Sequence, residues 1–76
     1  MGRIVPIPWK QFERFLLRVG CELIRQEGSH RVYWKNDLKR PIILPTYKKL
    51  PVFIIKNNLR LLEMTNEQYL DILKNL

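Results

Sequence analysis

The chain has 76 residues, the size of one small domain, and its single cysteine and single histidine exclude an internal disulfide and a zinc site built from them. Fourteen Lys and Arg against seven Asp and Glu give a net charge of +7, which favours a polyanionic or acidic partner. The sequence contains no recognisable secretory signal and no apolar run of membrane-spanning length, so we expect one cytoplasmic domain over residues 1–76, with no membrane contact and with Cys21 as a buried apolar residue.

The first predicted element is a helix between Pro8 and Gly20. Its apolar residues recur three and four positions apart and share one face: Trp9, Phe12, Phe15, Leu16 and Val19. Proline suits the first turn of a helix, and glycine suits a left-handed end.

Three short strands are predicted next. Alternating residues indicate strands over 21–26 and 30–35, joined by a turn at 27–29. The apolar segment 41–45 begins and ends with proline, so we expect it to form a third strand at an edge of the sheet.

Two helices complete the predicted fold. Residues 51–63 place apolar side chains on one face, and Thr65 to Gln68 form a capping-box pattern ahead of a final helix. The order α-β-β-β-α-α predicts an α+β fold with a three-stranded antiparallel sheet, helices on one face and the other face left available.

The positive charge is concentrated in the middle of the chain. Residues 31–60 contain one acidic side chain, Asp37, and eight basic ones: Arg31, Lys35, Lys39, Arg40, Lys48, Lys49, Lys56 and Arg60. This segment carries the whole net charge, which favours nucleic acid or an acidic protein as partner; improved solubility is the plainer alternative.

His30 is the candidate catalytic residue. An imidazole both accepts and donates protons near neutral pH. RNA cleavage needs a base for the ribose 2′-hydroxyl and an acid for the leaving oxygen, and this route requires no metal or cofactor. Gly28 would let a phosphate or sugar approach the backbone, and Ser29 adds a hydroxyl beside the imidazole. A plain hairpin turn followed by a solvent-facing histidine is the alternative, and the residue chemistry alone favours it.

The second strand raises a question about His30. Strict alternation puts His30, Val32 and Trp34 on one face, so His30 starts on the buried face if Val32 faces the helices. The other face carries three candidate RNA contacts, of which Arg31 and Lys35 would bind phosphates and Tyr33 would stack on a base. Cross-strand packing explains Tyr33 equally well. Further candidate phosphate contacts flank the third strand at its two ends: Lys39 and Arg40 before it, and Lys48 and Lys49 in the loop after it.

The segment from Arg25 to Tyr33, RQEGSHRVY, resembles the central motif of the HicA toxins, small mRNA interferases of prokaryotic toxin–antitoxin pairs. The similarity extends from about Trp9 to Leu73. One departure is Tyr47, which stands where members of that family often carry a second histidine. A second departure is Pro51, which replaces the family's usual Gly-Thr helix start.

The resemblance implies a fold like that of double-stranded-RNA-binding domains and a ribosome-independent endoribonuclease whose catalytic histidine is His30. It also implies an acidic HicB-type antitoxin that covers the active site. The competing hypotheses are a non-catalytic RNA-binding module and a protein-interaction partner with a basic face. The sequence leaves open whether the chain forms a homodimer or a hetero-oligomer with the antitoxin.

Overall fold

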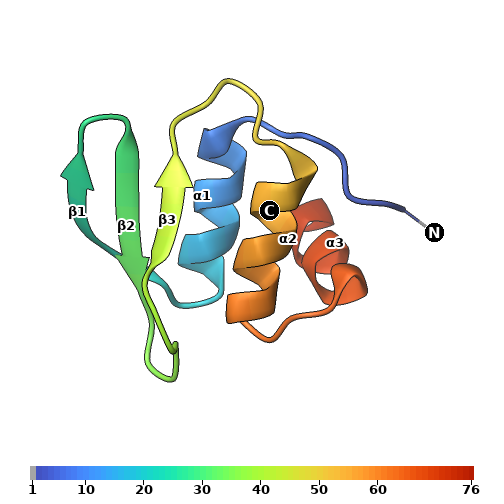
Figure 1. Ribbon diagram of the computed structural model, residues 1–76. Coiled ribbons are helices and arrows are strands. Elements are labelled where there is room, and N and C mark those ends of the chain that lie inside the picture. The colour runs from blue at the N-terminus through green and yellow to red at the C-terminus, as the bar shows by residue number, and fades with distance from the viewer. Residues whose placement is uncertain (1) are drawn as a thin grey trace.

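The computed structural model describes residues 2–76 as a three-stranded sheet with helices packed against one side (Figure 1). In chain order the elements are α1 (Trp9–Arg18), β1 (Glu22–Glu27), β2 (His30–Trp34), β3 (Ile42–Pro45), α2 (Val52–Leu61) and α3 (Asn66–Lys74). The strands are antiparallel in the order β1-β2-β3. The predicted α+β class and element order are confirmed, as is the edge position of β3.

Helix α1 forms because its apolar face is buried and both of its ends are defined. Phe12, Phe15 and Leu16 are fully buried on that face. The chain then leaves the helix through Gly20, whose φ of 101° is a left-handed conformation that a glycine adopts without a Cβ clash. The next amide, at Cys21, donates to the Leu16 carbonyl at 2.9 Å, so the helix end keeps its hydrogen bonding.

The inner face of the sheet meets the helices through β2 and β3. Tyr33 pairs with Ile42, and Arg31 pairs with Leu44, which places these four residues on the same face. Tyr33, Ile42 and Leu44 are fully buried in the core that includes the aromatic face of α1. By contrast, β1 lies on the far side of β2 from β3 and away from the helices (Figure 1), and all six of its residues are exposed.

This arrangement answers the question about the faces of β2. Tyr33, and not Val32, faces the helices, so His30, Val32 and Trp34 share the outer face. Val32 is nevertheless buried, because its cross-strand neighbours Arg25 and Ile43 flank it on that outer face. His30 is therefore exposed without any bulge in β2.

Helices α2 and α3 close the core on the side of β3. Ile55 and Leu59 of α2 are buried, and the helix ends at Leu61, earlier than predicted, ahead of Glu63 with its φ of 54°. The predicted capping box at the start of α3 is confirmed. Gln68 N donates to Thr65 Oγ1 at 3.1 Å, and Thr65 N donates to Gln68 Oε1 at 2.9 Å.

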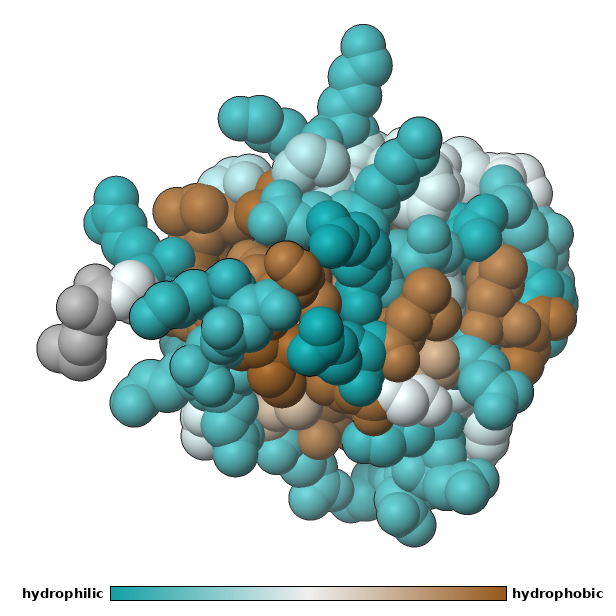
Figure 2. All heavy atoms as spheres, turned by 180° about the vertical axis from the view of Figure 1, so that it is seen from behind, coloured by the Kyte–Doolittle hydropathy of each residue, from teal (hydrophilic) through white to brown (hydrophobic). Residues whose placement is uncertain are grey.

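The rear of the molecule, seen in Figure 2, is largely hydrophilic, with apolar areas interspersed between the polar side chains. Within residues 2–76, none of the helices is both long and apolar enough to cross a lipid bilayer. Cys21 is buried, as predicted, and its burial raises the pKa of the thiol above its ordinary value.

Candidate active site

The turn before β2 fixes the position of His30. Gly28 has a φ of 61° and Ser29 has no positive φ, which fits a two-residue type II′ hairpin turn with glycine first. Glu27 and His30 pair across this turn, and His30 pairs with Pro45 of β3 on its other side. The histidine backbone is therefore held between two strands.

Two further contacts tie the turn to its neighbours. The Ser29 carbonyl accepts hydrogen bonds from the Thr46 amide at 2.8 Å and from Thr46 Oγ1 at 3.0 Å. The Gly28 carbonyl accepts one from Gln26 Nε2 at 3.1 Å. An ideal Cβ on Gly28 would have no heavy atom within 4 Å, so open space lies beside the backbone at this point.

The His30 side chain borders a pocket of about 270 Å³ between the outer side of β2–β3 and α2. The residues that line it are His30, Ile43, Pro45, Tyr47, Ile54, Asn57 and Asn58. We call this the His30 pocket. Its apolar part comes from Ile43, Pro45 and Ile54, and its polar groups are an imidazole, a phenol and two amides. An imidazole next to a phenol is a pair that can exchange protons with a bound substrate.

A basic hollow adjoins the His30 pocket. It has a volume of about 440 Å³ and is lined by Lys39, Arg40, Asn57, Arg60 and Leu61, so Asn57 borders both. Its three basic side chains are exposed. Among the described residues the ion pairs are Arg25–Glu27 and Arg31–Glu13, so none of the three cations of the hollow is in an ion pair, and they are available for an anionic ligand. Arg60 donates a hydrogen bond to Asn57 Oδ1 at 3.4 Å within the hollow.

Asn58 is the unexpected member of the pocket. It is only 5% exposed, and its Nδ2 atom has no hydrogen-bond partner among residues 2–76. It stands within the buried stripe of α2, between Ile55 and Leu59, where an apolar side chain would pack without any unmet polar group. A buried donor without a partner costs roughly 1–3 kcal/mol, so this residue destabilises the free protein relative to leucine.

The structure corrects the predicted role of Tyr33. Its ring is fully buried, so it cannot stack on a base, and its hydroxyl donates a hydrogen bond to the Glu13 carboxylate of α1. Burial, and secondarily this hydrogen bond, raises the pKa of Tyr33 to about 12. Cross-strand and helix packing is the correct explanation for this tyrosine.

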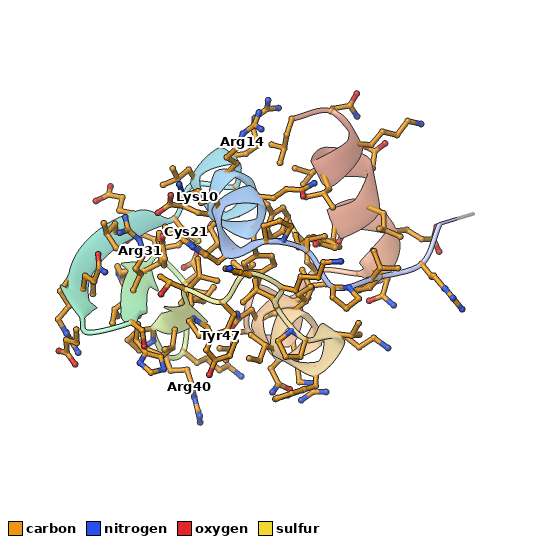
Figure 3. The ribbon with its side chains drawn as sticks, turned by 90° about the horizontal axis from the view of Figure 1, so that it is seen from above. Lys10, Arg14, Cys21, Arg31, Arg40 and Tyr47 are labelled. Carbon is orange, nitrogen blue, oxygen red and sulfur yellow. The ribbon has the colours of Figure 1, made fainter. Side chains whose placement is uncertain are left out.

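Arg31 is also engaged within the protein. Its guanidinium forms an ion pair with Glu13 at 3.0 Å, donates to Tyr33 Oη at 3.1 Å and lies over the ring of Trp9, 5.3 Å from the centroid. The contacts with Tyr33 and then Glu13 raise its pKa. Lys10 of α1 also lies over the Trp9 ring, whereas Tyr47 lies on the α2 side of the sheet (Figure 3). Arg31 thus fastens β2 to α1 on the face opposite His30.

Lys35 lies at one end of the sheet, and Lys48 and Lys49 lie near the other. Lys35 follows the end of β2 that is distant from His30, about 17 Å away at the rise of an extended strand, and borders a different hollow, with Asp37 and Glu63. Lys48 and Lys49 are exposed in the loop after β3, near the end of the sheet that carries His30. Neither of them lines the His30 pocket.

Sequence reasoning missed the contribution of α2 to the site. Asn57, Asn58 and Arg60 were not among the candidates, although a polar residue inside the apolar stripe of residues 55–62 is a signal that could have drawn attention to Asn58. Within residues 2–76, no group of three or more His, Cys, Asp and Glu side chains is placed to hold a metal ion.

Comparison with known families identifies the chain's relatives. Residues 9–64 match the family model described as HicA toxin of bacterial toxin-antitoxin, and this range includes α1, the whole sheet and α2. The chain belongs to the HicA toxin family. The predicted family is thereby confirmed. No match was found among the curated proteins or among the solved structures.

The HicA family match includes every residue of the His30 pocket and of the basic hollow. The capping box and α3 lie beyond its end at residue 64. Both candidate sites are therefore parts of the toxin domain itself.

Proposed function

We propose that this HicA-family chain is an endoribonuclease toxin that cleaves mRNA with His30 as its general acid or base. The observation that carries the proposal is the exposed histidine in a pocket bordered by a basic hollow with available cations. A general acid–base catalyst must be reachable by substrate, and an RNA-cleaving one needs positive charge close by. Both conditions are met on the same side of β3.

The reaction assigned to His30 is a transesterification, in which the ribose 2′-oxygen displaces the 5′-oxygen of the next nucleotide from the phosphorus. A base removes the proton from the 2′-hydroxyl, the oxygen attacks the adjacent phosphorus, and an acid protonates the departing 5′-oxygen. The products are a 2′,3′-cyclic phosphate and a 5′-hydroxyl. DNA lacks the 2′-hydroxyl, so this reaction is specific for RNA.

Tyr47 is the best candidate for the second proton-transfer group. It lines the same pocket as His30, and its side chain is 47% exposed, so solvent and substrate reach it. The backbone fixes its position, because the Tyr47 carbonyl accepts a hydrogen bond from the Trp9 amide at the start of α1 at 3.2 Å. We assign it the role of hydrogen-bond donor to the phosphate or the leaving oxygen.

Basic side chains would hold the RNA backbone around the cut. Lys39, Arg40 and Arg60 border the hollow next to the pocket, and Lys48 and Lys49 stand in the loop beyond Tyr47. Gly28 leaves open space beside the backbone two residues before His30, and Ser29 lies between them. Phosphate contacts of this kind position RNA without reading its sequence.

A HicB-type antitoxin is the proposed protein partner. An acidic protein would be attracted by the net charge of +7, and covering the His30 pocket would block access to the histidine. Co-expression with such an antitoxin should suppress toxicity, and the complex should weaken as salt is raised.

The test is cleavage of a defined mRNA by purified wild type and His30→Ala in the presence of EDTA. Wild type should give fragments with cyclic-phosphate ends, His30→Ala should lose activity by at least about 100-fold, and Tyr47→Phe should lose less. Lys74→Ala, which removes an exposed charge on α3, is the control. A His30→Ala protein that remains folded and cuts as fast as wild type would refute the proposal.

Expression in cells separates the competing hypotheses. Growth arrest with degraded transcripts supports the endoribonuclease. Saturable, salt-sensitive RNA binding without cleavage products would indicate the non-catalytic RNA-binding module instead. Arrest with intact transcripts and no RNA affinity would indicate a protein-interaction role.

A further inference from the structure

Asn58 has no function in the fold that explains its presence in the core stripe of α2. Its Nδ2 is buried and unpartnered, while its neighbours on that stripe, Ile55 and Leu59, are apolar. Buried polar groups in native proteins are nearly always hydrogen-bonded, so the exception calls for a partner from outside the chain. Asn58 lines the His30 pocket, so rotation of its amide about χ2 would turn Nδ2 toward a ligand there.

The size and the lining of the His30 pocket suit one flat heteroaromatic ring. Its volume of about 270 Å³ is at the low end for small-molecule sites, which admits a single base rather than a larger ligand. Ile43, Pro45 and Ile54 supply apolar walls, and the Tyr47 ring supplies an aromatic one. Single-stranded RNA is usually read in this way, with an unstacked base packed on apolar or aromatic side chains and hydrogen-bonded at its edge.

The basic hollow next to the pocket can bind the RNA backbone that adjoins such a base. Asn57 separates the His30 pocket from the cations Lys39, Arg40 and Arg60. A strand with one base in the pocket could place flanking phosphates against these cations.

We propose that the His30 pocket binds one nucleobase of the RNA and that Asn58 selects which base it is by donating a hydrogen bond from Nδ2. This inference rests on the proposed ribonuclease function and adds the residue that determines its sequence preference. The base must present an acceptor, a carbonyl oxygen or a ring nitrogen, to the amide. Asn58 is thus a specificity residue and takes no part in proton transfer.

Two substitutions distinguish recognition of a base by Asn58 from a packing role of its side chain. Asn58→Leu keeps the side-chain size, removes the donor and leaves no polar group unmet. Asn58→Asp keeps the shape but offers only acceptors when ionised, so it should favour a base that presents an exocyclic amino group. Asn66→Leu, an exposed asparagine in the first turn of α3, is the matched control.

The probe is a randomised pool of 2′-fluoro RNA, which lacks the attacking hydroxyl and cannot be cut by the proposed route. Wild-type protein selects bound molecules from the pool, and sequencing gives the base enrichment. We expect wild type and Asn66→Leu to enrich one base by about 5- to 100-fold, the discrimination that one good side-chain–base contact provides. Asn58→Leu should reduce the enrichment to below about twofold, and Asn58→Asp should change the base that is preferred.

The outcomes are distinguishable from those of the ribonuclease test. Base enrichment that depends on Asn58 supports this inference even if no RNA is ever cut. Cleavage of natural RNA by wild type, with unchanged enrichment in Asn58→Leu, overturns the inference and leaves the ribonuclease standing. Absence of any base enrichment in wild type also overturns it, as does an Asn58→Leu protein that loses affinity only for an acidic protein partner. Thermal unfolding of Asn58→Leu should occur at an equal or higher temperature than that of wild type.

Discussion

Replacing Glu13 by alanine tests whether the contacts between α1 and β2 hold the sheet in place. The Glu13 carboxylate accepts a hydrogen bond from the Tyr33 hydroxyl and has two contacts with the Arg31 guanidinium, at 3.1 and 3.0 Å. Its loss leaves the fully buried Tyr33 hydroxyl without an acceptor and Arg31 without its counter-charge. These groups connect segments that are 18 and 20 residues apart in the sequence.

The expected cost follows from the exposure of the groups. Hydrogen bonds to charged groups contribute about 1.5–3 kcal/mol each. Solvent reduces this here, because the side chains of Arg31 and Glu13 are 20% and 21% exposed. We expect Glu13→Ala to lower the free energy of unfolding by about 2–4 kcal/mol. A domain of 76 residues has roughly 4–11 kcal/mol in total, so the melting temperature should fall by about 10–25 °C.

The assay is urea and thermal unfolding of Glu13→Ala beside Glu27→Ala. Glu27 also forms an ion pair with an arginine, Arg25, but those two side chains are 66% and 57% exposed and belong to the same strand. Removing Glu27 should cost less than about 1 kcal/mol. Equal costs for the two variants would refute the reasoning, because they would show that burial and the link between α1 and β2 contribute nothing.

Three further predictions concern the turn, the last helix and the buried phenols. Thr65→Ala should lower the free energy of unfolding by about 1 kcal/mol in urea titrations, because both capping-box bonds of α3 depend on this residue. Gly28→Ala should cost about 1–2 kcal/mol, since the φ of 61° is unfavourable with a Cβ although nothing obstructs the methyl group; no measurable cost would contradict the turn geometry. Burial raises the pKa of Tyr69, like that of Tyr33, to about 12 from the ordinary value of 10. Between these two pH values both phenols therefore stay neutral in the folded protein and ionise in the unfolded chain. The free energy of unfolding is therefore unaffected by these phenols below pH 10 and falls as the pH rises toward 12. Tyr69→Phe should lose less of its free energy of unfolding over this range. It also removes a buried hydroxyl that has no partner among residues 2–76, so it should be at least as stable as wild type at neutral pH.

Local patterns predicted the elements of the fold because their causes are local. The spacing of Phe12, Phe15 and Leu16 defined α1, Gly20 defined its end, and Thr65 with Gln68 defined the start of α3. The end of α2 was predicted two residues too late, because nothing in the sequence required Glu63 to adopt a positive φ. Glu63 takes the left-handed position at the end of the helix that glycine usually occupies, with its amide donating to the Arg60 carbonyl at 3.1 Å and the Met64 amide donating to the Leu59 carbonyl at 3.0 Å.

The candidate site was predicted only in part, because some of it depends on contacts between segments that are distant in the sequence. His30 and the flexible Gly28 could be recognised from their chemistry, but which face of β2 is buried depends on whether Tyr33 finds a partner in the core. Glu13, 20 positions earlier in the chain, provides it. The approach of α2 to the outer side of β3 is likewise a tertiary contact, so Asn58 could be placed beside His30 only in three dimensions.

The position of β2 in the middle of the sheet has a consequence for motion. β1 is an edge strand whose six residues are all exposed, so its amides should exchange with solvent deuterium sooner than those of the core. The histidine backbone, however, is also paired with β3, through His30 and Pro45, and the Ser29 carbonyl with Thr46. Transient fraying of β1 would therefore loosen the outer strand while the imidazole keeps its place against α2.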